Sequence, residues 1–249
     1  MADLLTVQSL VALFTLTVLE IVLGVDNIIF LAIVTQDVPA EKQDVVRKLG
    51  LSLALIGRIA MVLGISWLLG LDQELFTLFG HSFSTKDVIL LAGGLFLTYK
   101  AVTEIYKTTE LKEDEDERPV KATKSTMAGV VFQIMVVDMV FAIDSVLTAV
   151  GLTQQYILII IAMTIAILAM MFFAGPLADF INEHPSIKML ALAFLVLVGV
   201  LLIADGFGEE INRSYVYFAI LFALGVEALN FRRQANLARE QAEQGPTGV

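Results

Sequence analysis

Long apolar runs separated by short polar segments fill the chain from about residue 7 to residue 230. A run of about 20 apolar residues is enough to cross the hydrocarbon core of a bilayer as an α-helix. Seven runs reach or approach this length, at residues 7–34, 47–70, 87–106, 126–152, 155–181, 187–204 and 214–230. The segment 71–86 is too polar to continue a span and is expected to form a short interfacial loop or helix. The pattern predicts an all-α, polytopic membrane protein with seven transmembrane helices.

The composition supports this prediction and excludes several functions. The chain is 57% hydrophobic and only 17% charged, and it contains no cysteine. Disulfides and thiolate metal sites are therefore excluded. A net charge of −10 argues against nucleic-acid binding, which needs a basic face. We find no Walker motif and no nucleophile–base–acid set, so the chain is not expected to be an enzyme. The first apolar run is too long for a signal peptide and is expected to be a retained span.

Lysines and arginines are distributed unevenly between the two sides of the predicted membrane. Twelve lie in the loops and tail on one side, whereas the other side has only Lys86 and Arg213. Positively charged loops tend to stay in the cytoplasm. We therefore predict that the N-terminus lies outside and the C-terminus lies in the cytoplasm.

Two of the predicted spans contain the same arrangement of polar residues. Residues 19–36 read LEIVLGVDNIIFLAIVTQ, and residues 137–154 read VDMVFAIDSVLTAVGLTQ. Aligned without a gap, they match at two acidic positions and at the polar position that follows the second acid: Glu20 with Asp138, Asp26 with Asp144, and Asn27 with Ser145. Apolar residues align by chance in membrane spans, but such a polar set does not. We interpret it as an internal duplication.

The duplicated segments lie in the first and fourth spans, so they cross the membrane in opposite directions. Inverted-topology repeats of this kind are typical of secondary transporters. We predict a 3+3 inverted repeat, with repeat one at about 7–106, repeat two at about 126–204 and an extra helix at about 214–230. Residues 1–231 would form one transmembrane domain, followed by a short cytoplasmic tail at 232–249.

The spacing of the polar residues predicts their depth and direction. Glu20 and Asp138 lie near the middle of their spans, and the second acid of each motif lies roughly 9 Å away along a helix. Because the spans are antiparallel, Asp26 is expected toward the cytoplasm and Asp144 toward the outside. At 100° per residue Glu20 and Asn27 share a helix face, whereas Glu20 and Asp26 do not. One ion could be held by all three residues of a motif only if the helix were broken, for example at the glycine before Asp26.

The six aligned residues are the candidate metal ligands. Carboxylates inside a membrane are costly and usually functional. Their carboxylate, amide and hydroxyl oxygens favour hard cations such as Mn²⁺, Mg²⁺ or Ca²⁺. The same acids are also candidates for proton carriage. A structural interpretation is open as well, in which Arg58 and Lys100 neutralise two of the acids in buried ion pairs. Lys100 is also one helical turn from Glu104 and placed to pair with it, so Arg58, Lys100 and Glu104 are candidate charge partners.

The paired motifs LEIVLGVDNIIF at 19–30 and VVDMVFAIDSVL at 136–147 resemble those of the TerC family of bacterial membrane proteins. Further likeness lies in DVILLAGGLFL at 87–97 and in HPSIKMLALAFLVLVGVLLIADG at 184–206. The family is associated by name with tellurite resistance, is similar to exporters of the LysE-like superfamily, and includes members regarded as manganese exporters. The resemblance implies a protein of the bacterial cytoplasmic membrane, with the six aligned residues along an ion pathway.

Together these features predict a secondary transporter that exports a divalent cation, Mn²⁺ first among the candidates, driven by an ion gradient such as protons. Glu20 and Asp138 would form the core of the site. Asp26 with Asn27 would face the cytoplasmic route, and Asp144 with Ser145 the outer route. One alternative is an exporter of small organic cations or amino acids, with Arg58 binding a carboxylate. Another is a non-transporting membrane component of tellurite or envelope-stress resistance. No resident cofactor is expected, and the sequence leaves the oligomeric state open.

Overall fold

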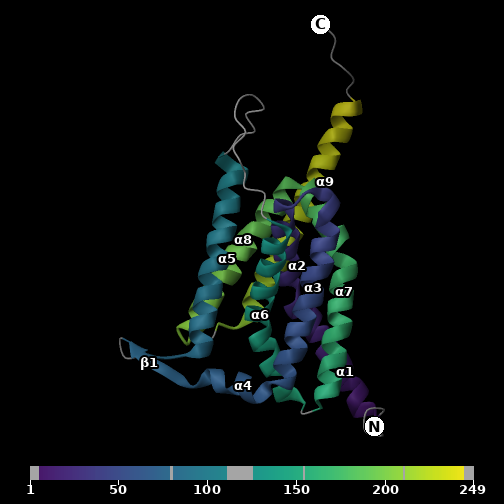
Figure 1. Ribbon diagram of the computed structural model, residues 1–249. Helices are drawn as coiled ribbons and strands as arrows, with labels where there is room; N and C mark the ends of the chain where they lie inside the picture. Colours follow the sequence, from purple (N-terminus) through teal and green to yellow (C-terminus); the bar gives the residue numbers. More distant parts are fainter. Residues whose placement is uncertain (1–5, 79–80, 111–125, 154, 210, 244–249) are drawn as a thin grey trace.

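A computed structural model describes residues 6–78, 81–110, 126–153, 155–209 and 211–243. The described chain is almost entirely helical (Figure 1). Its α-helices are α1 (Val7–Leu23), α2 (Val25–Val34), α3 (Ala40–Leu63), α4 (Ile65–Leu69), α5 (Thr85–Glu110), α6 (Met127–Leu152), α7 (Tyr156–Glu183), α8 (Pro185–Gly206) and α9 (Arg213–Glu243). Short 3₁₀ turns, η2 (Thr35–Asp37) and η3 (Gly70–Asp72), follow α2 and α4.

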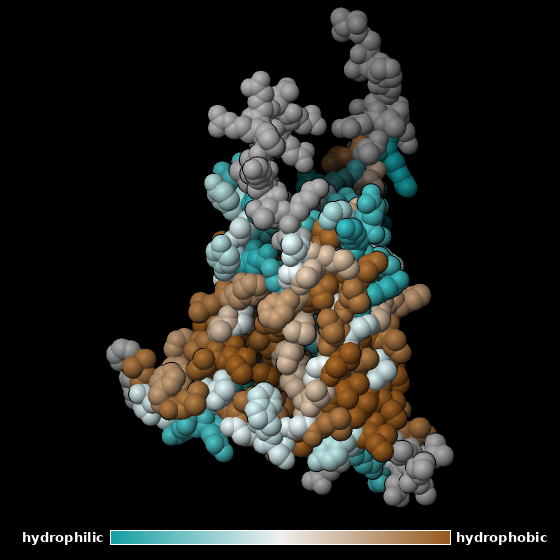
Figure 2. Space-filling model, in the orientation of Figure 1, coloured by the Kyte–Doolittle hydropathy of each residue, from teal (hydrophilic) through white to brown (hydrophobic). Residues whose placement is uncertain are grey.

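The long helices form a bundle of membrane-spanning elements. Six spans of the described chain are long and apolar enough to cross a bilayer, or seven when the bent pair α3–α4 is counted as one span. Figure 2 shows a broad hydrophobic band across the visible face, with hydrophilic residues gathered at the end where α9 finishes. The prediction of an all-α, polytopic membrane protein is confirmed.

The second span differs from its predicted bounds of 47–70. Helix α3 begins earlier, at Ala40, and ends at Leu63, where the chain turns by 78° into α4. Its 24 residues extend about 36 Å, which already exceeds the thickness of a hydrocarbon core. The apolar residues after Gly64 are therefore not needed to complete the span, and in Figure 1 α4 runs across one end of the bundle.

The segment 71–86 was expected to be a loop or short helix, and this prediction is wrong. It contains an antiparallel hairpin of β1 (Glu74–Leu78) and β2 (His81–Ser84). Phe76 and Phe83 stack across the two strands with ring centroids 5.3 Å apart, and Phe83 also meets Phe207 edge-on. This aromatic pairing stabilises a hairpin at the end of the bundle that also holds the N-terminus (Figure 1).

Glycines allow the helices to approach closely at two places. A Cβ atom at Gly24, between α1 and α2, would lie 2.6 Å from Met170 Sδ on α7. A Cβ atom at Gly94 on α5 would lie 2.6 Å from the carbonyl oxygen of Gly199 on α8. Small residues commonly permit such contacts between membrane helices. The break at Gly24 is gentle, because residues 7–37 still form one candidate span, and Ala142, which aligns with Gly24, lies inside the uninterrupted α6.

Candidate functional site

Three helices bring two carboxylates and one guanidinium together inside the bundle. Arg58 of α3 donates from Nη1 to Oε2 of Glu20 on α1 at 2.7 Å. It also donates from Nε to Oδ2 of Asp138 on α6 at 3.0 Å and from Nη2 to Oδ1 at 2.8 Å. Glu20, Arg58 and Asp138 are only 1%, 2% and 4% exposed. The cluster is therefore a fully enclosed ion-pair triad within the membrane-spanning part of the protein.

The small polar residue of each motif lies against the first acid of the other motif. Asn27 donates from Nδ2 to Oδ1 of Asp138 at 3.0 Å. Ser145 lies beside the carboxylate of Glu20. The seven-residue spacing explains this arrangement, because Glu20 and Asn27 share one helix face and Asp138 and Ser145 share another. Four of the six candidate ligands thus meet at one place, which we call the central cluster: Glu20, Asn27, Asp138 and Ser145.

Two oxygens of the central cluster accept no hydrogen bond within the described part of the chain, although the Ser145 hydroxyl lies beside the Glu20 carboxylate. They are Oε1 of Glu20 and Oδ1 of Asn27, and both are fully enclosed. A buried oxygen without a partner loses its hydration without compensation. Each of these two atoms could accept a further hydrogen bond or contact a cation.

Asp26 and Asp144 do not join the central cluster. Asp26, in the first turn of α2, lines a small pocket with Asp205 of α8 and Tyr217 of α9. Asp144 is 39% exposed and lies 3.9 Å from the ammonium group of Lys86. It lines a cavity of about 310 Å³ together with Lys86 and Asp205. We call this space the Asp144 cavity.

Asp205 lines both of these spaces, whereas the expectation that Asp26 and Asp144 mark opposite entrances stays a prediction. Asp205 sits in the last turn of α8, at the end of the bundle that holds the N-terminus (Figure 1). Counting residues along a single helix gave a depth but ignored the neighbours that α8 and α9 bring to each acid. Asp205 and Tyr217 are the site residues that sequence reasoning missed, and the available signal was an acid at the very end of an apolar run.

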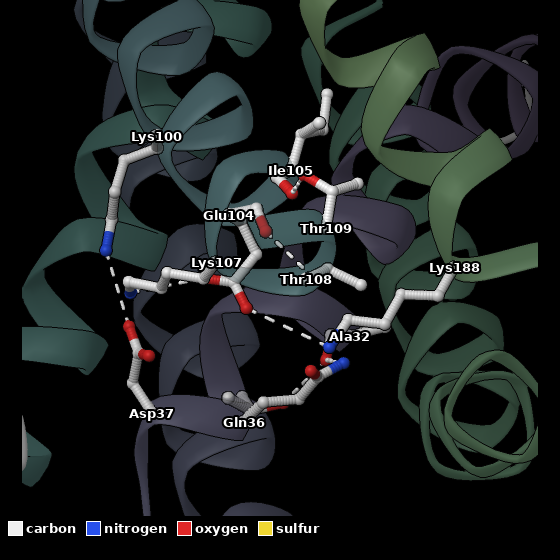
Figure 3. Close-up of polar contacts among 11 residues, drawn as sticks. Ala32, Gln36, Asp37, Lys100, Glu104, Ile105, Lys107, Thr108, Thr109 and Lys188 are labelled. Atoms are coloured by element: carbon white, nitrogen blue, oxygen red, sulfur yellow. Dashed lines mark hydrogen bonds and ion pairs between the residues drawn. The ribbon is translucent and has the colours of Figure 1, made fainter. Parts of the chain in front are cut away.

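A second group of ion pairs lies at the opposite end of the bundle (Figure 3). Lys100 of α5 reaches Asp37 of η2, with Nζ 3.3 Å from Oδ2. Glu104 contacts Lys107 at 3.3 Å and Lys188 of α8 at 3.8 Å. The expected pairing of Lys100 with Glu104 is wrong, since the lysine side chain points across to η2 and the glutamate faces the other two lysines. These contacts connect α5 to η2 and to α8.

The described residues contain no group of three or more His, Cys, Asp or Glu side chains placed to hold a metal ion. The central cluster offers two carboxylates, an amide oxygen and a hydroxyl, with the guanidinium of Arg58 between the carboxylates. The donor set fits a hard cation, but the carboxylates in this arrangement are already occupied by a positive charge.

Similarity to known proteins identifies the family of the chain. Residues 5–242 match the integral membrane protein TerC family. The chain is 45% identical over 222 residues to the UPF0053 inner membrane protein YgdQ of Escherichia coli, covering 89% of this chain and 92% of that protein. It is 43% identical over 225 residues to a UPF0053 protein of Haemophilus influenzae, covering 90% and 94%. It also matches the UPF0053 inner membrane protein YoaE of Escherichia coli at 42% identity, over 92% of this chain but 44% of that longer protein. No solved structure matches. With nearly its whole length matched and relatives this similar, the chain belongs to the TerC family of integral membrane proteins.

Proposed function

We propose that this protein is a secondary transporter that exports a divalent metal cation, with Mn²⁺ as the first candidate, from the cytoplasm. The observation that carries the proposal is the central cluster, which places two carboxylates, an amide oxygen and a hydroxyl from α1, α2 and α6 inside a membrane-spanning bundle. Burying charged groups inside a membrane costs free energy, so charged residues found there usually have a function. The resemblance to manganese exporters of the same family supports the choice of cargo.

The proposed route runs from the central cluster to the Asp144 cavity. On the orientation predicted from the lysines and arginines, this cavity opens to the outside, and its acids would attract the departing cation. The cytoplasmic end would be closed by the pairs Lys100–Asp37 and Lys188–Glu104, which tie α5 to η2 and α8. With the central cluster enclosed and the cytoplasmic end closed, this arrangement would be an occluded carrier with a cavity on its outer side. The proposed 3+3 inverted repeat would allow the opposite state to form by rocking one half against the other.

Arg58 argues against the alternative that the cargo is an amino acid. For that role its guanidinium would have to bind a substrate carboxylate. Its Nε, Nη1 and Nη2 atoms all donate to Glu20 and Asp138. A substrate carboxylate would meet two protein carboxylates at the same place, and like charges so close together repel strongly in a low-dielectric interior.

Metal flux into liposomes tests the proposal. Purified protein is reconstituted, and uptake of Mn²⁺, Mg²⁺ and Ca²⁺ is followed with and without a proton gradient. We expect saturable Mn²⁺ flux that is abolished in Glu20→Gln and Asp138→Asn. The matched control is Asp44→Asn, since Asp44 pairs with Lys48 on the surface, where both side chains are 63% exposed. Flux that is equal in all variants, or absent from the unmodified protein, would overturn the proposed function.

A further inference from the structure

The position of Arg58 within the central cluster has a consequence for how a cation could load. The guanidinium contacts both carboxylates at once, one oxygen of Glu20 and both oxygens of Asp138. A metal ion that used both carboxylates as ligands would have to occupy the space that the guanidinium fills. Arg58 and Glu20 are 2% and 1% exposed, so a cation that reaches Glu20 also meets the guanidinium.

Arg58 makes different numbers of hydrogen bonds to the two carboxylates, and we expect the carboxylate with fewer bonds to leave the guanidinium first. Asp138 is held by two hydrogen bonds in the fork arrangement that suits a guanidinium, whereas Glu20 is held by one. The other oxygen of Glu20 and the side-chain oxygen of Asn27 accept no hydrogen bond among the described residues. An incoming cation thus finds one oxygen of Glu20 and one of Asn27 without a hydrogen bond before it needs to break any contact between Arg58 and Asp138.

We propose that Arg58 is a tethered counter-ion that takes the place of the cargo in the empty carrier and is displaced when a cation binds. This inference rests on the proposed function. Loading transfers Glu20 from the guanidinium to the metal, and release of the metal returns it. No proton is needed for this exchange, because the guanidinium stays charged throughout.

The counter-ion has a purpose in the transport cycle. An empty carrier must change conformation with its site vacant, and two uncompensated carboxylates would make that step costly inside a membrane. Arg58 neutralises one of the two charges during that step. It also competes with the cargo, so it lowers the affinity of the carrier for the metal. Compared with a carrier that lacks Arg58, the unmodified carrier should therefore bind the metal more weakly but return to its loading conformation faster.

Substitution of Arg58 separates this role from a purely structural one. Metal binding is measured as the Mn²⁺-dependent rise in the unfolding temperature of purified protein, which gives an apparent Kd, and flux is measured in liposomes. Removing the competitor in Arg58→Gln should lower the apparent Kd about tenfold while lowering maximal flux about tenfold or more. Arg58→Lys keeps the charge but not the fork, so both of its values should lie between those of Arg58→Gln and the unmodified protein.

Arg47 provides the matched control, because it is the other buried arginine of α3 and contacts Gln43 rather than the central cluster. Arg47→Gln should leave the apparent Kd unchanged. If Arg58→Gln does not fold, the test is made with Arg58→Lys, whose apparent Kd should also be lower than that of the unmodified protein. A folded Arg58 variant that binds Mn²⁺ as the unmodified protein does, or more weakly, overturns the counter-ion role alone. Unmodified protein that neither binds nor moves any metal overturns the proposed function and the counter-ion role together.

Discussion

Arg58 and Asp138, 80 residues apart in the chain, face each other with two parallel hydrogen bonds of 3.0 Å and 2.8 Å. The fork of the guanidinium matches the two oxygens of the carboxylate, so the pair fixes direction as well as distance. It joins α3 to α6, and of all the candidate spans α6 is the one most enclosed by its neighbours. The same contact therefore sets the packing of two membrane helices and the charge state of the central cluster.

Breaking this pair should destabilise the protein. Asp138→Asn removes a charge that Arg58 contacts through two nitrogens and leaves the guanidinium with Glu20 alone. Losing one partner of a buried ion pair typically costs about 3–5 kcal/mol. Thermal unfolding in detergent should show a clearly lower midpoint. In the control Asp44→Asn, which removes an exposed pair, the change should stay below about 1 kcal/mol. Equal midpoints in the two variants would mean that the Arg58–Asp138 pair contributes no more than an exposed one.

The ion pairs at the two depths should differ in strength and in salt dependence. Lys100 and Asp37 are each 28% exposed, whereas Arg58 and Asp138 are 2% and 5% exposed at their side chains. A double-mutant cycle on Lys100 and Asp37 should give a coupling energy of roughly 0–1 kcal/mol that falls as salt is added. The same cycle on Arg58 and Asp138 should give a larger coupling that salt changes little. A salt-sensitive Arg58–Asp138 coupling would contradict the enclosed geometry.

The membrane fold could be predicted from the sequence because one strong physical constraint decides it. Backbone groups in lipid must be satisfied within each segment, so a long apolar run has to be a helix. The hairpin at β1 and β2 lies outside such a run, and its pairing depends on the contact of Phe76 with Phe83, which apolar run length does not encode. The bend at Gly64 was missed for a related reason, since α4 is as apolar as the span that precedes it.

The site could be predicted only in part. The seven-residue spacing correctly indicated that Glu20 and Asn27 share a face, and the structure brings both to the central cluster. Spacing along one helix carries no information about other helices. Asp205 lines one pocket with Asp26 and another with Asp144, and this depends on how α8 packs against the other helices, which is a property of tertiary structure.

The close contact at Gly24 should make this position intolerant of side chains. A Cβ atom there would lie 2.6 Å from Met170 Sδ and 2.9 Å from the carbonyl oxygen of Glu20. We expect Gly24→Ala to destabilise the protein by about 1–3 kcal/mol, the usual cost of overpacking. Met170→Ala should partly rescue it by making room. Gly151→Ala is the control, because a Cβ atom at Gly151 meets nothing within 4 Å. A neutral Gly24→Ala would show that the Met170 side chain moves aside at little cost.

Two acids that line the Asp144 cavity should have separable roles. Asp87 accepts hydrogen bonds at Oδ2 from the backbone N–H and the hydroxyl of Ser84, each at 2.8 Å, and Ser84 Oγ accepts in return from the backbone N–H of Asp87. This is a capping arrangement at the start of α5, so Asp87→Asn should lower stability by about 1 kcal/mol. Asp205 lines one pocket with Asp26 and another with Asp144, on the proposed route.

Asp205→Asn should therefore act on transport more than on folding. Removing one negative charge from the cavity weakens its attraction for a divalent cation, so the metal concentration at half-maximal flux should rise several-fold. Because the effect is electrostatic, it should shrink at high ionic strength, which a structural defect would not do. The measurement is Mn²⁺ flux in liposomes at two salt concentrations, alongside unfolding temperatures for Asp205→Asn and Asp87→Asn. If Asp205→Asn lowers the unfolding temperature as Asp87→Asn does while half-saturation stays fixed, Asp205 supports the fold and the cation leaves by another path.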